Sequence, residues 1–132
     1  MLPSEATRDR GETSIQTVLL VPIMLGIFLL CLHATALTHG SHVASAAAIR
    51  AAQAAAFSDS SGNDIVKALN EVEQVVTDLG SHVAGAPQIR IDAKSVTVTV
   101  SVEVQSLISF LPTSVTRTAT VSREQFQNEQ DR

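Results

Sequence analysis

A long charge-free segment near the N-terminus constrains this chain more than any other feature. No Asp, Glu, Lys or Arg occurs between Thr13 and Ile49, and the stretch from Val18 to Leu37 is predominantly apolar. At about 1.5 Å of helical rise per residue, that stretch spans about 30 Å, the thickness of the hydrocarbon core of a bilayer. We therefore expect one transmembrane helix, which Pro22 kinks without preventing it from spanning.

The basic residues around the apolar run predict its orientation. Arg8 and Arg10 precede the run, whereas the first basic residue after it is Arg50. Because Lys and Arg are retained on the cytoplasmic side, the N-terminus is expected in the cytoplasm of a cell whose plasma membrane holds the chain as a single-pass protein. The expected organisation is a cytoplasmic leader at 1–12, a transmembrane and extended helix at 13–57, an extracytoplasmic α+β domain at 58–123 and a polar tail at 124–132.

The second half of the expected helix is rich in alanine. Nine alanines occur between Ala44 and Ala56, which gives high helix propensity with little side-chain bulk, and Gly40 is a point where the helix can bend. Small side chains let neighbouring helices approach closely. This favours packing of like subunits against Ala47, Ala48, Ala51 and Ala52, although a well-formed helix without such contacts would have the same composition.

The remaining chain predicts one more helix and a small sheet. Apolar residues at spacings of four and three indicate an amphipathic helix that ends near Gly80. Its predicted apolar stripe is Ile65, Leu69, Val72, Val76 and Leu79.

Beyond Pro87 the period of the apolar pattern changes to two, which is typical of strands. The expected strands are Gln88–Asp92, Val96–Val104 and Val115–Val121, the last at the edge of the sheet. In the central strand the valines should face a helix and the alternating threonines should face water. The fold class is therefore α+β, with a long helix, a second amphipathic helix and an antiparallel three-stranded sheet in a pilin-like order.

Composition and motifs argue against several function classes. Nine Lys and Arg against thirteen Asp and Glu are scattered along the chain, so no basic stripe for nucleic acid can be drawn. The four histidines lack acidic or cysteine partners at zinc-ligand spacing. No nucleophile elbow, phosphate loop or dinucleotide fingerprint occurs. We expect no enzyme, no cofactor and no metal site.

The junction before the apolar run carries a family resemblance. The sequence Arg8-Asp-Arg-Gly-Glu-Thr-Ser-Ile-Gln-Thr-Val-Leu-Leu-Val-Pro22, the alanine-rich segment around Arg50 and the ending at Val115–Glu124 resemble TadE-like proteins. These are minor pseudopilins of tight-adherence type IV pilus systems. The resemblance implies a structural role in pilus assembly, with the membrane, pilin subunits and the assembly machinery as partners.

The same resemblance implies processing by a prepilin peptidase. The cut would follow Gly11 and leave a chain that begins at Glu12. Pilin-type sequences usually place a glutamate five residues after the glycine, where this chain has Gln16. A neutral amide cannot form the ion pair that a carboxylate makes with the amino terminus of a neighbouring subunit, which favours a minor subunit over the major one.

Two other interpretations remain open at the level of sequence. The apolar run followed by Ala34-Thr-Ala36 matches a signal peptide, which would release a secreted protein that begins at Leu37. A generic single-pass anchor unrelated to pili would have the same topology. The spacing from Gly11 to Pro22 favours the pseudopilin over the generic anchor.

Overall fold

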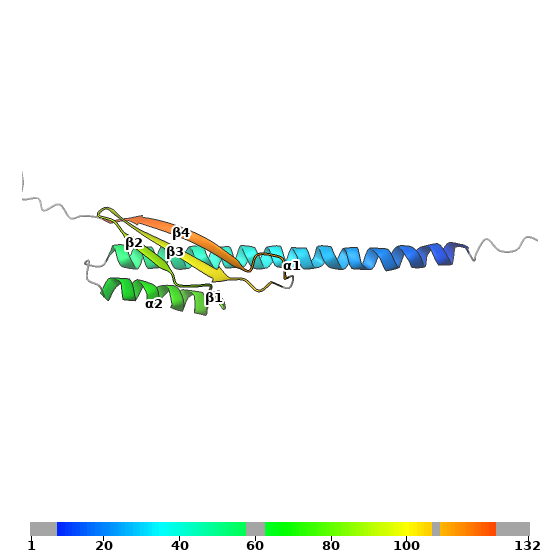
Figure 1. Ribbon diagram of the computed structural model, residues 1–132, viewed down its shortest axis with the longest axis horizontal. Helices are drawn as coiled ribbons and strands as arrows, with labels where there is room; N and C mark the ends of the chain where they lie inside the picture. The colour runs from blue at the N-terminus through cyan, green and yellow to red at the C-terminus, as the bar shows by residue number, and fades with distance from the viewer. Residues whose placement is uncertain (1–7, 58–62, 107–108, 124–132) are drawn as a thin grey trace, which may run out of the picture. The chain divides into compact units, whose positions relative to one another are not determined.

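The computed structural model describes residues 8–57, 63–106 and 109–123, with the side chains of residues 8–14 and 64 left out. Its elements are α1 (Arg8–Ala56), α2 (Asn63–Asp78), β1 (His82–Val83), β2 (Gln88–Ile91), β3 (Ser95–Glu103) and β4 (Ser114–Ser122), shown in Figure 1. The chain divides into two units, Met1–Thr35 and Ala36–Arg132, and α1 contributes residues to both. The expected α+β class is confirmed, with β1 as a fourth strand.

Helix α1 is longer than expected at its start. It comprises 49 residues and begins at Arg8 rather than near residue 13, with Pro22 inside it. A proline within a helix removes one backbone hydrogen bond and crowds the preceding turn, but here it does not end the helix. Gly40 does not end it either, because α1 continues to Ala56.

Helix α2 ends at a glycine cap, as the sequence predicted. Gly80 has a φ of +71°, a left-handed backbone conformation that residues with a Cβ rarely adopt. The amide of Ser81 donates to the carbonyl of Val76 at 2.9 Å, and the amide of Gly80 donates to the carbonyl of Thr77 at 2.9 Å. These two bonds form a Schellman motif, which satisfies carbonyls that the last turn leaves without partners.

The buried stripe of α2 differs in part from the predicted one. Val72 and Val76 are fully buried as expected, but Ile65 and Leu79 are 40% and 45% exposed. Ala68 and Val75 are buried in their place. The spacing of apolar residues allows either arrangement, and the small side chain of Ala68 lets the helix approach its neighbours closely. The buried face is therefore rotated toward the smaller residues.

The sheet is antiparallel and is built around β3. One side of β3 pairs with β2 and, further along, with β1, while the other side pairs with β4 over nine residue pairs from Ser95↔Ser122 to Glu103↔Ser114. As predicted, β4 lies at an edge. Strand β1 was not predicted, because two residues are too few to show an alternating pattern.

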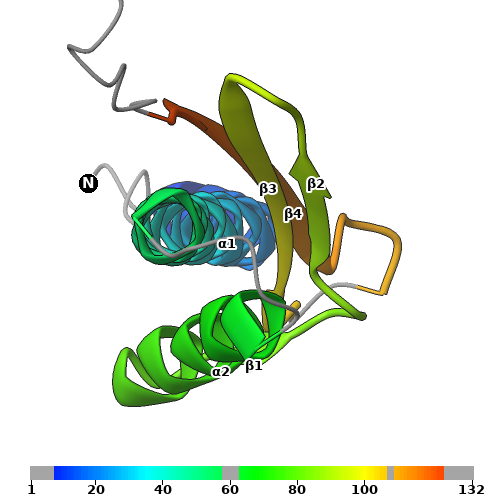
Figure 2. The ribbon, with the colours of Figure 1, turned by 90° about the vertical axis from the view of Figure 1, so that its left-hand side faces the viewer.

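The two helices cover one face of this sheet. Figure 2 shows the second half of α1 and helix α2 on the same side of β2, β3 and β4. All the valines of β3 from Val96 to Val102 are fully buried on that side, which confirms the predicted register.

The other face of the sheet is lined with hydroxyl groups. The Oγ1 atoms of Thr97 and Thr120 lie 3.1 Å apart and those of Thr99 and Thr118 lie 3.0 Å apart. Cross-strand hydroxyl pairs of this kind stabilise a sheet modestly while keeping its outer face polar. Slipping the strands by one residue would expose the valines and bury these hydroxyls, so the register is strongly specified.

Candidate membrane and packing surfaces

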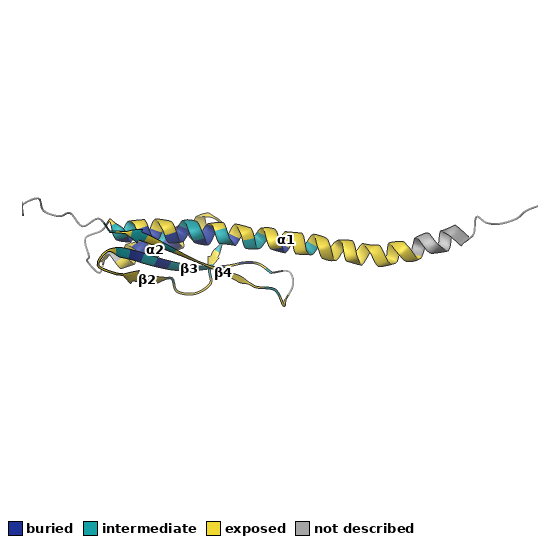
Figure 3. Cartoon of the chain, turned by 90° about the horizontal axis from the view of Figure 1, so that it is seen from above, coloured by how far each residue is buried: buried dark blue, intermediate teal, exposed yellow. Residues whose placement is uncertain are grey.

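The first unit presents apolar side chains on every side of α1. Between Ile15 and Leu32 the large apolar side chains are mostly exposed, from 43% at Leu32 to 75% at Val18. Figure 3 shows this part of α1 in the colour of exposed residues. Among the described helices, only α1 contains a segment that is long and apolar enough to cross a membrane. A signal sequence near the N-terminus would have the same length and composition.

The predicted processing residues lie near the start of this helix. Gly11 and Glu12 are within α1, but their side chains fall outside the described residues. Gln16 and Pro22 are both exposed on the helix. An exposed amide at Gln16 can hydrogen-bond to another molecule but carries no charge to attract one. The structure thus leaves the cleavage prediction untested.

His33, which lies near the end of the apolar run, is a buried polar residue in the first unit. His33 is 5% exposed, and neither ring nitrogen has a hydrogen-bond partner within the described chain. This burial was not predictable from the sequence, because His33 lies near the end of an apolar run, where its side chain could equally reach water.

The alanine face of α1 lies in the core of the second unit. Ala47, Ala48, Ala51 and Ala52 are fully buried in one apolar cluster with the valines of α2 and β3. We predicted this face as a contact between like subunits. Within the described structure the chain's own sheet and α2 already cover it, so a neighbouring subunit would have to displace them.

A glycine sets the close approach between α1 and the end of β3. A Cβ built at Gly40 would lie 2.7 Å from Cγ2 of Val104, closer than two carbon atoms approach without displacement. The side chain of Val104 is buried, with only 5% of its surface exposed. Gly40 therefore allows close packing between α1 and β3, a role that was not predicted from the sequence. The partners are 64 positions apart, so no local pattern could have revealed the contact.

Two hollows flank α1 just beyond the end of the apolar run. One, of about 370 Å³, is lined by Ala36, Gly40 and three polar residues, His39, His82 and Glu103, among others. His82 and Glu103 are direct cross-strand partners. No group of three or more potential metal ligands occurs among the residues that the structure describes. The site offers hydrogen-bonding groups at the surface.

The other hollow, of about 560 Å³, lies between α1 and the start of β4. It is lined by Leu37, Ser41, Pro112, Val115 and Arg117, among others. The Nε atom of Arg117 donates to Oγ of Ser41 at 2.9 Å. Arg117 stands opposite Val100 in the register, so this edge strand carries a charge among its helix-facing positions. Such a charge discourages further strands from pairing at the edge.

No protein-family model matches this chain, and comparison with curated proteins and with solved structures gave no significant match. The arrangement of elements is the informative result. A long apolar N-terminal helix is followed by a small antiparallel sheet that packs on the second half of that helix, which is a pilin-like layout.

Proposed function

We propose that this chain is a membrane-anchored minor pseudopilin, or a related structural component of a Tad-type type IV pilus assembly or secretion system. The single observation that carries the proposal is the division of labour within α1. Its first half is apolar on all sides and mostly exposed, while its second half is the central helix of a folded domain. The proposal gives the chain a structural role and no catalytic one.

The mostly exposed half of α1 favours a lipid environment. A large apolar side chain is stabilised by about 1.5–3 kcal/mol when it is removed from water. Many such side chains, including Leu19, Met24 and Phe28, are more than half exposed along this segment. In water this surface would drive aggregation, whereas a bilayer covers it on all sides.

The junction before the span supports pilin-type processing. The arginines before Gly11 favour a cytoplasmic N-terminus, where a prepilin peptidase would act. After such a cut, Glu12 would be the new N-terminal residue and Gln16 would replace the charged residue of ordinary pilin subunits. Packing of like or related subunits would then involve the exposed apolar half of α1, since the alanine face is occupied.

The first experiment is to isolate the protein from its native cell, separate membrane from medium, and determine its N-terminal residue and intact mass. A membrane form that begins at Glu12 would establish pilin-type processing. A form in the medium that begins at Leu37 would contradict the proposal and establish secretion after signal-peptide removal. An uncut membrane form would leave a single-pass anchor without the pilin step.

A second experiment tests the structural role. The full chain is crosslinked in native membranes through single cysteines placed at exposed positions of α1, in a background where Cys31 is changed to Ser. Crosslinks from Leu25 or Phe28 to a pilin-type protein would support assembly through the apolar half. Crosslinks from exposed residues of the second half alone, such as Gln53, would contradict that arrangement.

A further inference from the structure

The loop between β3 and β4 ends in an exposed apolar tip. We define the loop tip as residues 110–112, Phe-Leu-Pro. The side chain of Phe110 is 86% exposed, the most exposed large apolar side chain that the structure describes. Loops of water-soluble domains usually present polar residues, so a phenylalanine held out to solvent needs an explanation.

The base of this loop is fixed to α1. The amide of Val104 donates to the carbonyl of Thr113 at 2.7 Å, which closes the loop. Val104 is also the side chain that packs against Gly40 of α1. The loop therefore starts and ends at the level of Gly40, about one helical turn beyond Leu37, the last residue of the apolar run.

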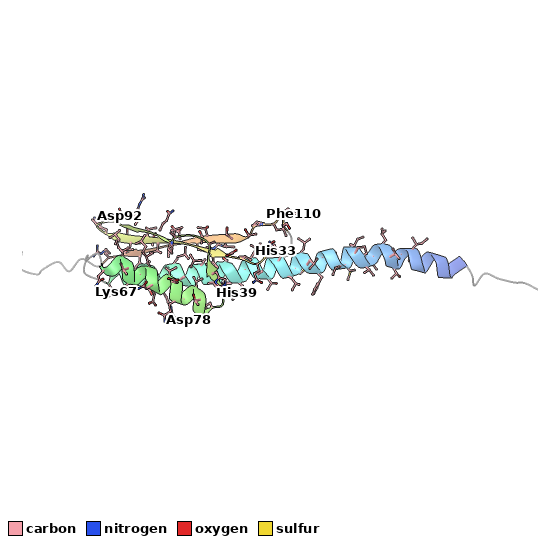
Figure 4. The ribbon with its side chains drawn as sticks, turned by 60° about the horizontal axis from the view of Figure 1, so that its bottom comes forward. His33, His39, Lys67, Asp78, Asp92 and Phe110 are labelled. Carbon is pink, nitrogen blue, oxygen red and sulfur yellow. The ribbon has the colours of Figure 1, made fainter. Side chains whose placement is uncertain are left out.

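The tip lies close to Leu37, the residue that ends the apolar run. Pro112 lines the same hollow as Leu37. Two residues of chain reach at most about 7 Å, so Phe110 lies within that distance of Pro112. Figure 4 shows Phe110 and Asp92 at opposite ends of the sheet domain, with Lys67 near the Asp92 end.

The segment that contains the loop tip is uncharged, and Glu103 and Arg117 flank it at the base of the loop. Between Glu103 and Arg117 the sequence holds no Asp, Glu, Lys or Arg. The β2–β3 turn at the far end, in contrast, contains Asp92 and Lys94. An uncharged segment with an exposed phenylalanine is suited to the boundary between lipid headgroups and acyl chains, where interfacial segments bury Trp, Phe and Leu side chains.

We propose that the loop tip rests in the outer interface of the membrane that α1 crosses, with the ring of Phe110 inserted among the lipids. The inference rests on the proposed membrane anchoring of α1. The tip would be a second membrane contact beside the helix, and it would limit the tilting and rotation of the sheet domain about the point where α1 leaves the bilayer.

The test uses tryptophan fluorescence, because the chain contains no tryptophan. The full chain is reconstituted in phosphatidylcholine and phosphatidylglycerol vesicles as Phe110→Trp, Phe57→Trp or Leu25→Trp. Phe57 is a matched control, since it is 83% exposed but lies about 30 Å beyond Leu37 along α1. Leu25→Trp reports on the span itself. Emission is recorded with brominated lipids and with aqueous iodide as quenchers.

For Phe110→Trp we expect emission shifted to shorter wavelength, at least two-fold quenching by lipids brominated near the headgroup, and protection from iodide. Phe57→Trp should show the reverse. If Leu25→Trp is quenched by brominated lipids and Phe110→Trp is not, the loop proposal is overturned while the anchor stands. If neither is quenched, the membrane anchoring itself is wrong.

One further outcome would also overturn the proposal. A blue-shifted Phe110→Trp that is protected from iodide but insensitive to brominated lipids would mean that protein, such as a second copy of the chain, covers the tip. Hydrogen exchange of the β3 amides in each variant shows that the domain is folded and that the fluorescence reports on the native loop.

Discussion

The two halves of α1 differ in the size of their apolar side chains and in whether protein covers them. From Ile15 to Leu32 the helix carries large apolar side chains, most of which are exposed. From Val43 to Ala55 its buried face is almost entirely alanine, and a sheet and a second helix cover it. Small side chains allow backbones to approach closely, whereas large ones gain most from a fluid medium that adapts to them. Size, more than hydrophobicity, thus distinguishes the half that protein covers.

The largest effect is expected from charges in the first half. Leu25→Lys combined with Phe28→Lys should remove most of the chain from the membrane fraction, because each lysine near the centre of a span costs about 2.5–3.5 kcal/mol. The measurement is the fraction that resists alkaline extraction of membranes. As a control, Gln53→Lys on the exposed side of the second half should leave this fraction unchanged. If the double variant still resists alkaline extraction, the first half of α1 does not differ from the second half in spanning a membrane.

The second half should instead be sensitive to added volume. Ala48→Leu places a larger side chain in a fully buried position and should destabilise the domain by about 1–3 kcal/mol. Hydrogen exchange of β3 amides in the full chain, in detergent micelles, measures the loss. Gln53→Leu, on the exposed side of the same helix, should change it by less than about 0.5 kcal/mol. Equal effects of the two variants would mean that the alanine face is not packed as described.

The two glycines of α1 allow the same substitution to be compared in each half. Gly40→Ala should destabilise the domain by about 1 kcal/mol, because overpacking against Val104 outweighs the gain in helix propensity. Val104 is β-branched and cannot easily turn away. Gly26→Ala, where nothing lies within 4 Å of the new Cβ, should leave domain stability unchanged.

A double-mutant cycle sharpens this prediction. Val104→Ala should recover part of the loss caused by Gly40→Ala, with a coupling of about 0.5–3 kcal/mol. Additive effects of the two substitutions would rule out the direct contact and leave helix flexibility as the role of Gly40.

The smallest effect is expected at Pro22. Pro22→Ala restores a backbone hydrogen bond in the first half and should slow hydrogen exchange of α1 amides near residue 22. The free energy of opening of β3 should change by less than about 0.5 kcal/mol, since the described chain packs nothing against this segment. A larger change in β3 would show that the two halves are energetically coupled.

Strong local periodicity made much of this fold predictable. The alternation of valine with threonine in β3 fixes both its conformation and its buried face, and Gly80 marks the end of α2 by its conformation. The apolar run from Val18 to Leu37 indicated a membrane segment by length alone. Each of these signals lies within about twenty neighbouring residues, where helix and strand geometry act directly.

Features that depend on distant partners were beyond the sequence. The alanines of α1 suit a neighbouring subunit or the chain's own sheet equally well, and only the tertiary fold decides between them. The same applies to Gly40 and Val104, whose contact joins the helix to the C-terminal end of β3. The exposed Phe110 had no periodic pattern around it and became informative only when its position relative to Leu37 was known.

The long pairing of β3 with β4 has a mechanical consequence. Its hydrogen bonds run across the strands, and all nine residue pairs are consecutive. A pull on the C-terminal end of β4 along the strand loads these bonds together, whereas a sideways pull would open them one after another. The domain should therefore resist tension along the strand far better than peeling, a useful property for a domain that, under the proposed function, α1 holds to a membrane at one end.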